Sequence, residues 1–345
     1  MVSFVIPTLN SERTLGECLD AILAQDYPRK DYEIVIADAG SSDSTLKIAK
    51  SKGVDAICEN PLKTGEAGKT AGIKASRGEL IALVDSDNIL PSKDWLARMA
   101  APFSDPSVFA AEPIMYSARE SDPSLTRYFA HLGMNDPVCL FVGNYDRFSA
   151  VTGKWTGLKI DTEEKDGWKK LTIKDKIPTI GANGFIFRRE ILEKVSWEPY
   201  FFDIDVAALA AMKGCGAIAK VDTSIIHLYC AKFGDFARKQ RRRIKDFLFF
   251  AKSKERTYPW ESQRKGGIVL FILSCLTLLP LAVQAILFAV RAPKGSKALA
   301  FWHIPVCWAT LWIYGTGVLM KLLGFKPKMV DRSTWQTSSP KPTAP

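Results

Sequence analysis

The chain has 345 residues and carries 47 Lys and Arg against 37 Asp and Glu, a formal net charge of +10. This length allows one large domain or two smaller ones, and the basic excess favours anionic partners such as phosphates, nucleic acid or a lipid surface. Its seven cysteines are scattered without a Cys-x-x-Cys pair, which argues against a disulfide framework and a zinc site and indicates a reducing compartment. Residues 2–6 lack a charged flank and are followed by proline, so no signal peptide is predicted.

The first fifty residues alternate between strand-like and helix-like patterns. Residues 2–6 predict a strand that ends at a proline, and residues 33–37 predict a second strand that ends in the polar loop 38–45. Apolar residues at helical spacing predict a helix over 15–23, and the run 46–52 is also helix-like. The alternation indicates βαβ units and a mainly parallel sheet.

An apolar run, Leu80–Val84, is followed at once by Asp85 and Asp87. The run predicts a strand buried on both faces, with the two carboxylates at its carboxyl end, where ligands bind in open α/β sheets. Mg²⁺ is usually held by one or two carboxylates, with substrate phosphates completing its shell. Taken alone, Asp-Ser-Asp-Asn is an ordinary turn sequence, so the interpretation as a metal site depends on the rest of the chain.

The region after this strand is less regular. Residues 131–180 show no clear period and are interpreted as an insertion over the sheet, on the acceptor side. The turn Gly181–Gly184 precedes a short predicted strand, 185–187, and residues 203–212 predict a helix. Residues 220–226 predict a further strand, which His227 follows.

A basic amphipathic helix is predicted within the segment 231–262. One face carries Phe236, Ile244, Phe247, Leu248 and Ala251, and six Lys and Arg residues between 238 and 245 dominate the rest. This pattern is typical of a helix in a membrane interface, and an ordinary surface helix is the alternative.

Two long apolar runs follow, Gly266–Val290 and Ala298–Leu319, and each is long enough to cross a bilayer. We expect a transmembrane hairpin over 266–323 in the cell membrane; a buried pair of core helices is the weaker alternative. The strongest basic cluster precedes the first run, so the positive-inside rule places the N-terminal domain in the cytoplasm. The tail, 324–345, is predicted to be disordered and to return to that side.

At this point the chain resembles the family-2 glycosyltransferases of the GT-A fold. Four blocks carry the resemblance in order: Val5-Ile6-Pro7-Thr8-Leu9-Asn10, Asp38-Ala39-Gly40-Ser41-Ser42-Asp43-Ser44-Thr45, Asp85-Ser86-Asp87 and Phe202-Asp203-Ile204-Asp205. The resemblance covers roughly residues 1–245 and implies a Rossmann-like nucleotide-sugar-binding catalytic domain, which we place at 1–230. The chain departs from the family pattern at Ala39, where a second acid is usual, and at Ile204, where Glu is usual.

The resemblance implies roles for residues of the donor site. Asp38 matches the acid that binds the base, and its carboxylate can accept the imide N–H of uracil; a helix cap or turn acid is the alternative. Pro7, Thr8 and Glu12 line the same edge and contact base and ribose. The family often has a basic residue near the position of Lys69 that approaches the diphosphate, so Lys69 is the candidate here, with a solvated surface lysine as an equal alternative.

The metal site implied by the resemblance uses Asp87 as the direct ligand of Mn²⁺ or Mg²⁺. Asp85 contacts ribose or the metal through water, and His227 matches a metal-binding histidine, which suits Mn²⁺ somewhat better. The alternative for His227 is a strand-end histidine bonded to a backbone carbonyl.

The remaining roles concern the acceptor side. Asp205 matches the catalytic base, with Asp203 in reserve because it is the more natural helix cap. Asn183 is a candidate for a sugar hydroxyl, with a turn role as the alternative. Arg242 belongs to the basic block Gln240-Arg241-Arg242-Arg243, which closes over the diphosphate in membrane-bound relatives but lacks the family's tryptophan here.

These features predict an inverting, metal-dependent glycosyltransferase that moves a sugar from a nucleotide-sugar, a UDP-sugar in the leading version, to a hydroxyl of a lipid-linked or glycolipid acceptor. One alternative acceptor is polyprenyl or dolichyl phosphate, which needs no base. Alternatives of other classes are a nucleotidyltransferase and a non-catalytic, membrane-tethered binding module. The leading hypothesis involves the membrane as a partner and no nucleic acid.

Overall fold

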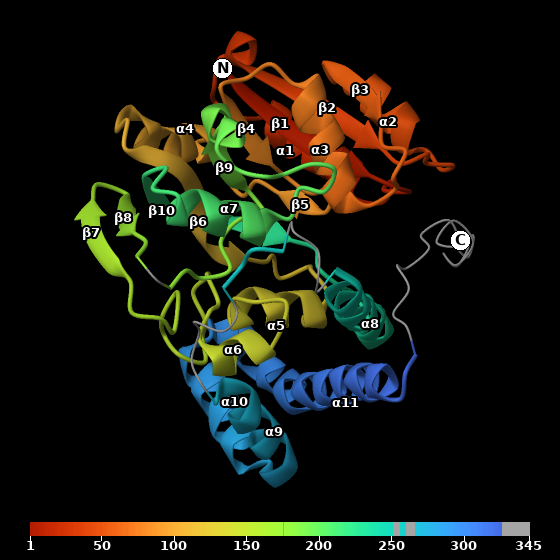
Figure 1. Ribbon diagram of the computed structural model, residues 1–345, viewed down its shortest axis with the longest axis vertical. Helices are drawn as coiled ribbons and strands as arrows, with labels where there is room; N and C mark the ends of the chain where they lie inside the picture. The colour runs from red at the N-terminus through yellow and green to blue at the C-terminus, as the bar shows by residue number, and fades with distance from the viewer. Residues whose placement is uncertain (175, 251–255, 260–265, 326–345) are drawn as a thin grey trace.

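The centre of the computed structural model is a mixed sheet of ten strands among the described residues, which are 1–174, 176–250, 256–259 and 266–325 (Figure 1). Across the sheet the strands are β3 (Ala56–Glu59), β2 (Tyr32–Asp38), β1 (Val2–Thr8), β4 (Leu80–Leu83), β9 (Phe185–Arg188), β6 (Val108–Ser117), β10 (Ala217–His227), β8 (Trp168–Thr172) and β7 (Asp161–Lys165), with β5 (Asn88–Ile89) paired to β10. Strands β1 to β4 are mutually parallel, and β9 runs antiparallel to both of its neighbours. The predicted α/β architecture with a mainly parallel sheet is therefore confirmed.

Helices cover both faces of this sheet because successive side chains of its strands point to opposite sides. In β1, Phe4 and Ile6 join the core beneath one helical layer, whereas Val5 joins the core on the other face. The first layer contains α1 (Leu15–Leu23), α2 (Thr45–Ser51) and α4 (Trp95–Ala100), and the second contains α3 (Gly65–Ala75) and α7 (Asp203–Met212). Short 3₁₀ turns lie at Arg29–Asp31, Ala101–Ser104 and Arg189–Glu193.

Helix α3 lies unusually close to β1 because two of its glycines face that strand. A Cβ atom at Gly68 would be 2.8 Å from Pro7 Cβ, and one at Gly72 would be 2.4 Å from Val5 Cγ1. Only glycine permits this approach, which brings Lys69 to the carboxyl end of the sheet.

The region interpreted as an insertion is partly an extension of the sheet. Its hairpin β7–β8 pairs with β10 at the sheet edge. Before the hairpin, α5 (Ser124–Leu132) and α6 (Val138–Val142) form a base on which the C-terminal helices pack.

The C-terminal region contains α8 (Phe233–Phe250), α9 (Gly267–Thr277), α10 (Leu279–Arg291), the 3₁₀ segment η5 (Lys294–Trp302) and α11 (His303–Leu322). The single helix expected over 266–290 is not formed: its two halves meet at Leu278 with a bend of 94°. Pro280 lies in the first turn of α10; it has no N–H to donate to the carbonyl four residues earlier and its ring clashes with that carbonyl, so α9 cannot continue through it.

By length and composition, Lys294–Leu322 could cross a membrane, and the bent pair α9–α10 is a broken span or a re-entrant loop. The expected hairpin of two spans is therefore not confirmed. Helix α8 forms over the described part of the predicted amphipathic segment, with Phe236 and Ile244 buried and Phe247 exposed; Ala251 lies outside the described residues. Most of the tail that was expected to be disordered, 326–345, also lies outside them.

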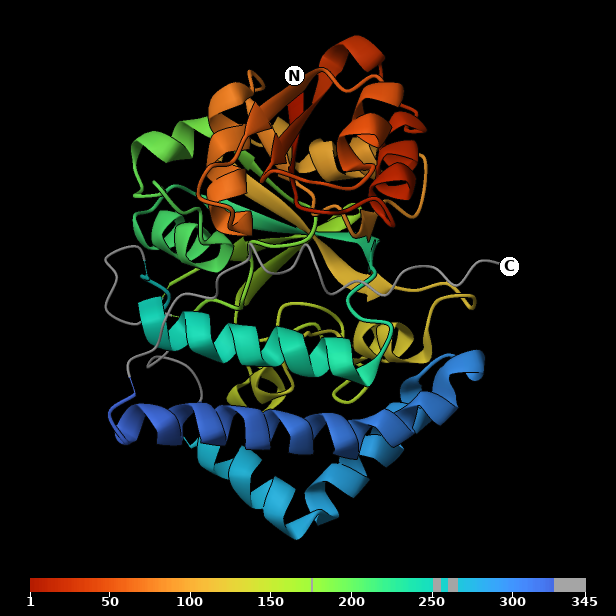
Figure 2. The same ribbon diagram turned by 90° about the vertical axis from the view of Figure 1, so that its right-hand side faces the viewer.

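Figure 2 shows the resulting layers: the sheet with its covering helices, then α8, then α11, with α9 and α10 below. A hydrophobic core joins α5 and α6 to these C-terminal helices through residues such as Tyr128, Phe141, Phe271 and Phe288. The C-terminal region thus packs directly on α5 and α6.

Candidate active site

Asp38 ends β2, and its carboxylate is held by its own loop. Oδ1 accepts hydrogen bonds from Thr8 Oγ1 at 2.8 Å and Ser41 Oγ at 2.6 Å, and Oδ2 accepts from the N–H groups of Gly40 at 2.9 Å and Ser41 at 2.8 Å. Four donors occupy a carboxylate that offers about four lone-pair sites. Asp38 therefore shapes the loop, and its carboxylate has little capacity left for a base N–H.

The neighbouring loop is tied to β2's loop by two reciprocal bonds. Glu12 accepts from Ser44 N at 3.0 Å, while its own N–H donates to Asp43 at 3.1 Å. Glu12 is exposed, and Pro7 lies within β1 beside Gly68. Pro7 and Thr8 thus end β1 and Glu12 follows in the next loop, and contact of these residues with base and ribose stays a prediction.

Lys69 joins two acids that are far apart in sequence. Its ammonium group pairs with Asp203 and lies 3.7 Å from Asp85 Oδ1. Burial opposes the charge on Lys69, but the carboxylates of Asp203 and Asp85 outweigh it and raise its pKa. Burial is also the main reason why the pKa of Asp203 rises to about 7, with Lys69 opposing that rise.

Asp203 begins α7 without capping it, because no side chain accepts a hydrogen bond at the helix start. One of its oxygens meets Lys69, and the other, Oδ1, is buried without a hydrogen-bond partner among the described residues. An unsatisfied buried acceptor is costly, so this oxygen marks a place where a ligand's donor would be stabilised.

Asp205 lies elsewhere. Its side chain is 1% exposed, Oδ1 accepts from Tyr258 N at 2.9 Å, and Oδ2 lies 3.3 Å from Arg256 Nε. Burial raises the pKa of Asp205, with Arg256 opposing the rise. The structure thus brings Asp203, rather than the preferred candidate Asp205, together with Lys69 and Asp85.

Asp87 and His227 form a second cluster beside the first. Asp87 Oδ2 lies 3.6 Å from His227 Nε2 and 3.7 Å from Lys239 Nζ. Burial alone would raise the pKa of Asp87, but His227 and Lys239 outweigh it and hold that pKa well below its usual range. Asn135 Nδ2 lies 3.3 Å from His227 Nδ1 on the other side of the ring.

This cluster fits a hard or borderline cation, but only with ligands from a substrate. Asp87 Oδ2 and His227 Nε2 lie 3.6 Å apart, a separation that two ligands of one cation on bonds of about 2.1 Å can span. No group of three or more His, Cys, Asp or Glu that could hold a metal occurs in the described part of the chain. Asp87 and His227 would therefore hold a metal with oxygens of a bound diphosphate, while Asp85 is turned toward Lys69.

Asn183 and Arg242 are placed less favourably than expected. Both ends of the Asn183 amide are used: Nδ2 donates to Tyr116 OH at 2.9 Å, and Oδ1 accepts from Asn88 Nδ2 at 3.1 Å. Arg242 lies 4.0 Å from Asp246 on α8, and it is Lys239 of the same helix that approaches Asp87. Lys239 is thus a site residue that the prediction missed; the only sequence signal was its place in the basic run.

A buried ion cluster beneath the turn 181–184 was also missed. Arg147 pairs with Glu112 and Asp146, and Lys220 Nζ lies 2.7 Å from Glu112 Oε2. The cluster holds the turn, because Glu112 accepts from Gly181 N at 3.0 Å and Arg147 donates to the carbonyl of Ala182 at 2.9 Å. Pairing of this kind offsets the desolvation of buried charges.

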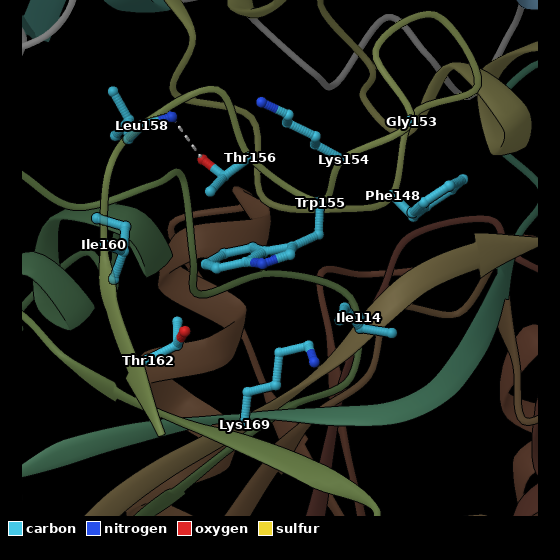
Figure 3. Close-up of a pocket in the computed structure, with 10 residues that line it drawn as sticks. All are labelled: Ile114, Phe148, Gly153, Lys154, Trp155, Thr156, Leu158, Ile160, Thr162 and Lys169. Atoms are coloured by element: carbon cyan, nitrogen blue, oxygen red, sulfur yellow. Dashed lines mark hydrogen bonds between the residues drawn. The ribbon is translucent and has the colours of Figure 1, made fainter. Parts of the chain in front are cut away.

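A cavity of about 400 Å³ opens beyond this cluster, between β6, the β7–β8 hairpin and the loop 148–160. Figure 3 shows the Trp155 ring at its centre, with Lys154, Ile160 and Thr162 around it. Lys220 Nζ lies 5.7 Å from the Trp155 ring centroid, so a ring that lines the cavity also approaches the buried ions. None of the sequence-predicted site residues lines it.

Comparison with known proteins agrees with this architecture. Glycosyltransferase AglE of Haloferax volcanii is 31% identical over 112 residues, which are 31% of this chain and 36% of that protein. The dolichyl N-acetyl-alpha-D-glucosaminyl phosphate 3-beta-D-2,3-diacetamido-2,3-dideoxy-beta-D-glucuronosyltransferase of Methanococcus voltae is 34% identical over 101 residues, 28% of this chain and 31% of that protein. The matched stretch thus spans about a third of the length of these relatives.

Among solved structures, the mannosyltransferase PcManGT from Pyrobaculum calidifontis, in complex with GDP-Man and Mn²⁺, matches with a TM-score of 0.53. The two chains are 19% identical, and the match covers 94% of this chain and 87% of the other, a likeness of fold. The model of the family described as Glycosyl transferase family 2 matches residues 3–196, more than half of the chain. The chain therefore belongs to glycosyltransferase family 2.

Proposed function

We propose that the protein transfers a sugar from a nucleotide-sugar to a hydroxyl group of a membrane-associated acceptor, with inversion at the anomeric carbon. The observation that carries this proposal is the pair of adjacent clusters at the carboxyl ends of the strands, Asp203–Lys69–Asp85 and Asp87–His227. One cluster offers a base and a cation, and the other offers the ligands for a metal–diphosphate unit. Family membership supports the reaction class.

Asp203 is the base in this proposal. A sugar hydroxyl is a weak nucleophile, and a base works best when its pKa lies near the working pH. Asp203 meets this condition with a pKa of about 7, and its buried Oδ1 has no partner among the described residues. Asp205 then stabilises the start of α7 through Tyr258 and Arg256.

The diphosphate of the donor lies next to Asp87 and Lys239 in the proposed complex. Asp87 and His227 would hold Mn²⁺ or Mg²⁺, which supplies positive charge to the departing nucleoside diphosphate. Lys239 adds a second positive charge at 3.7 Å from Asp87. Lys69 pairs with Asp203 and lies 3.7 Å from Asp85, so it orients both carboxylates.

The nucleotide of the donor and the kind of acceptor are proposed from the comparisons and from the C-terminal helices. A UDP-sugar is the first donor to test, and GDP-mannose the second, since the fold relative from Pyrobaculum was solved with GDP-Man. The long apolar C-terminal helices and the action of the Methanococcus relative on a dolichyl-linked sugar support a lipid-linked acceptor. Transfer to polyprenyl phosphate, which is already ionised, would not need Asp203.

The test is calorimetric and enzymatic. The full chain is titrated with a panel of UDP- and GDP-sugars in the presence of Mn²⁺, and release of nucleoside diphosphate is followed with lipid-linked acceptors. We expect one donor to bind, and Asp87→Ala to lose metal-dependent binding while the exposed-site control Asp222→Asn keeps it. Failure of every nucleotide-sugar to bind, or release of pyrophosphate instead, would contradict the proposal.

A further inference from the structure

Helices α9 and α10 form a V with its tip at Leu278. The two ends away from the tip lie on the same side, against the catalytic domain (Figure 2). At the end of α10, Arg291 donates to the carbonyl of Val151. The following turn is tied to α5, because Arg127 donates to the carbonyl of Gly295 at 2.6 Å and His131 Nε2 lies 2.9 Å from Ser296 Oγ. A crossing by α9–α10 would carry 291–297 to the opposite side of the bilayer from α5, which these contacts exclude.

The V is shallow enough to stay within one leaflet. At about 1.5 Å per residue, α9 is about 16 Å long and α10 about 20 Å. With the bend of 94°, legs inclined equally to the membrane normal reach a depth of about 12–14 Å. This depth is slightly less than half of a hydrocarbon core of about 30 Å.

Helix α11 lies along α8 and cannot cross a bilayer without it. The hydroxyl of Tyr314, which has one proton to donate, lies 2.7 Å from Gln240 Oε1 and 2.5 Å from Asp136 Oδ2. Gly317 faces Ile244 so closely that an added Cβ would lie 3.0 Å from its Cγ1. A spanning α11 would therefore draw the basic helix α8 into hydrocarbon, at a cost of several kcal/mol for each charge.

The exposed surface of the V matches lipid. Its large exposed side chains include Ile268, Leu273, Leu276, Leu279, Ile286 and Val290. Cations lie where headgroups would be: Lys294 and Lys297 follow the V. Arg241, Lys245 and Lys321 line a groove of about 380 Å³ between α8 and α11, and none of these three forms an ion pair with another described residue.

We propose that the protein is monotopic: α9 and α10 enter one leaflet of an anionic bilayer as a re-entrant wedge, α11 lies in the interface, and no described segment crosses. The groove between α8 and α11 then holds the phosphate of an anionic lipid beside aliphatic walls. This mode of attachment does not depend on the transfer reaction, so its test and that of the proposed function fail separately.

The first experiment determines the side on which residue 297 lies. Full-length protein with Cys58, Cys139 and Cys215 replaced by serine is added to preformed vesicles of equal parts phosphatidylcholine and phosphatidylglycerol. Single cysteines are introduced as Lys297→Cys and, on the catalytic domain, Lys47→Cys. We expect a membrane-impermeant maleimide to label both equally; protection of Lys297→Cys until detergent is added would overturn the proposal.

The second experiment needs no cysteine replacement. Leu279→Asp places a charge at the tip of the V, where Leu279 is 71% exposed, and Met212→Asp makes the same kind of change at a residue of α7 that is 58% exposed. We expect Leu279→Asp to weaken flotation with anionic vesicles by at least about tenfold and Met212→Asp to leave it unchanged. Equal binding by the two variants, or equal binding of the parent to pure phosphatidylcholine vesicles, would contradict the wedge or its anionic preference respectively.

Discussion

Lys69 on α3 and Asp203 at the start of α7 form a buried ion pair across 134 residues of sequence. The pair positions Asp203 beside Asp85, and loss of its cation would leave two acids close together without compensation. We expect Lys69→Met to lower kcat/KM by at least about 100-fold. Lys74→Met, five residues further along α3 in a half-exposed pair with Glu198, is the control and should keep nearly full activity.

The two acids of α7 should respond differently to the same substitution. Asp203→Asn removes the proposed base and should lower kcat by about 10²–10⁴-fold. Asp205→Asn keeps the acceptor for Tyr258 N–H, so we expect near-normal kcat with a lower unfolding temperature. Steady-state kinetics and thermal unfolding of both variants check this; unchanged kcat in Asp203→Asn would favour a phosphate acceptor.

The dependence of kcat/KM on pH should report the ionisation of Asp203. A base works only when it is ionised, and the pKa of Asp203 is about 7 because burial disfavours its charge. We therefore expect kcat/KM to rise with pH until about pH 7 and then level off. In Asp203→Asn the residual rate should lose this rise, and a profile of unchanged shape would assign the titration to another group.

The features of the fold and of the site that could be predicted from the sequence are those that local patterns determine. The strand before Asp85 follows from five apolar residues, and the position of Asp87 at a carboxyl end follows from the parallel sheet. The choice between Asp203 and Asp205 could not be predicted, because it depends on Lys69 and on the segment 256–258, which are distant in sequence.

The same limit applies to α8 and to the V. A lysine that meets Asp87 and an arginine that faces lipid look alike in a basic helix, and only the packing of α8 separates Lys239 from Arg241. The bend at Leu278 had a local signal in Pro280, but hydropathy alone treats the run as continuous.

His227 should contribute to metal affinity through its position beside Asp87. We expect His227→Ala to weaken Mn²⁺ binding in the presence of nucleoside diphosphate by at least about tenfold, measured by calorimetry. His131→Ala is the matched control, since His131 contacts Ser296 and lies away from the carboxylates. Equal Mn²⁺ affinity in the two variants would remove His227 from the proposed site.

Replacing a cation of the buried ion cluster should lower the free energy of unfolding by an amount that depends on which carboxylates lose their partner. Arg147→Met would strip both Glu112 and Asp146 of their main partner and free the turn 181–184, whereas Lys220→Met leaves Glu112 paired with Arg147.

Burial is the main reason why the pKa of Lys220 is lowered to about 8, so its charge is already weakly favoured. We expect losses of about 3–5 kcal/mol in the free energy of unfolding for Arg147→Met, less for Lys220→Met, and under about 1 kcal/mol for the surface-pair control Lys165→Met. Urea titrations followed by tryptophan fluorescence measure this order; a larger loss in Lys220→Met than in Arg147→Met would show that Lys220 is the central cation.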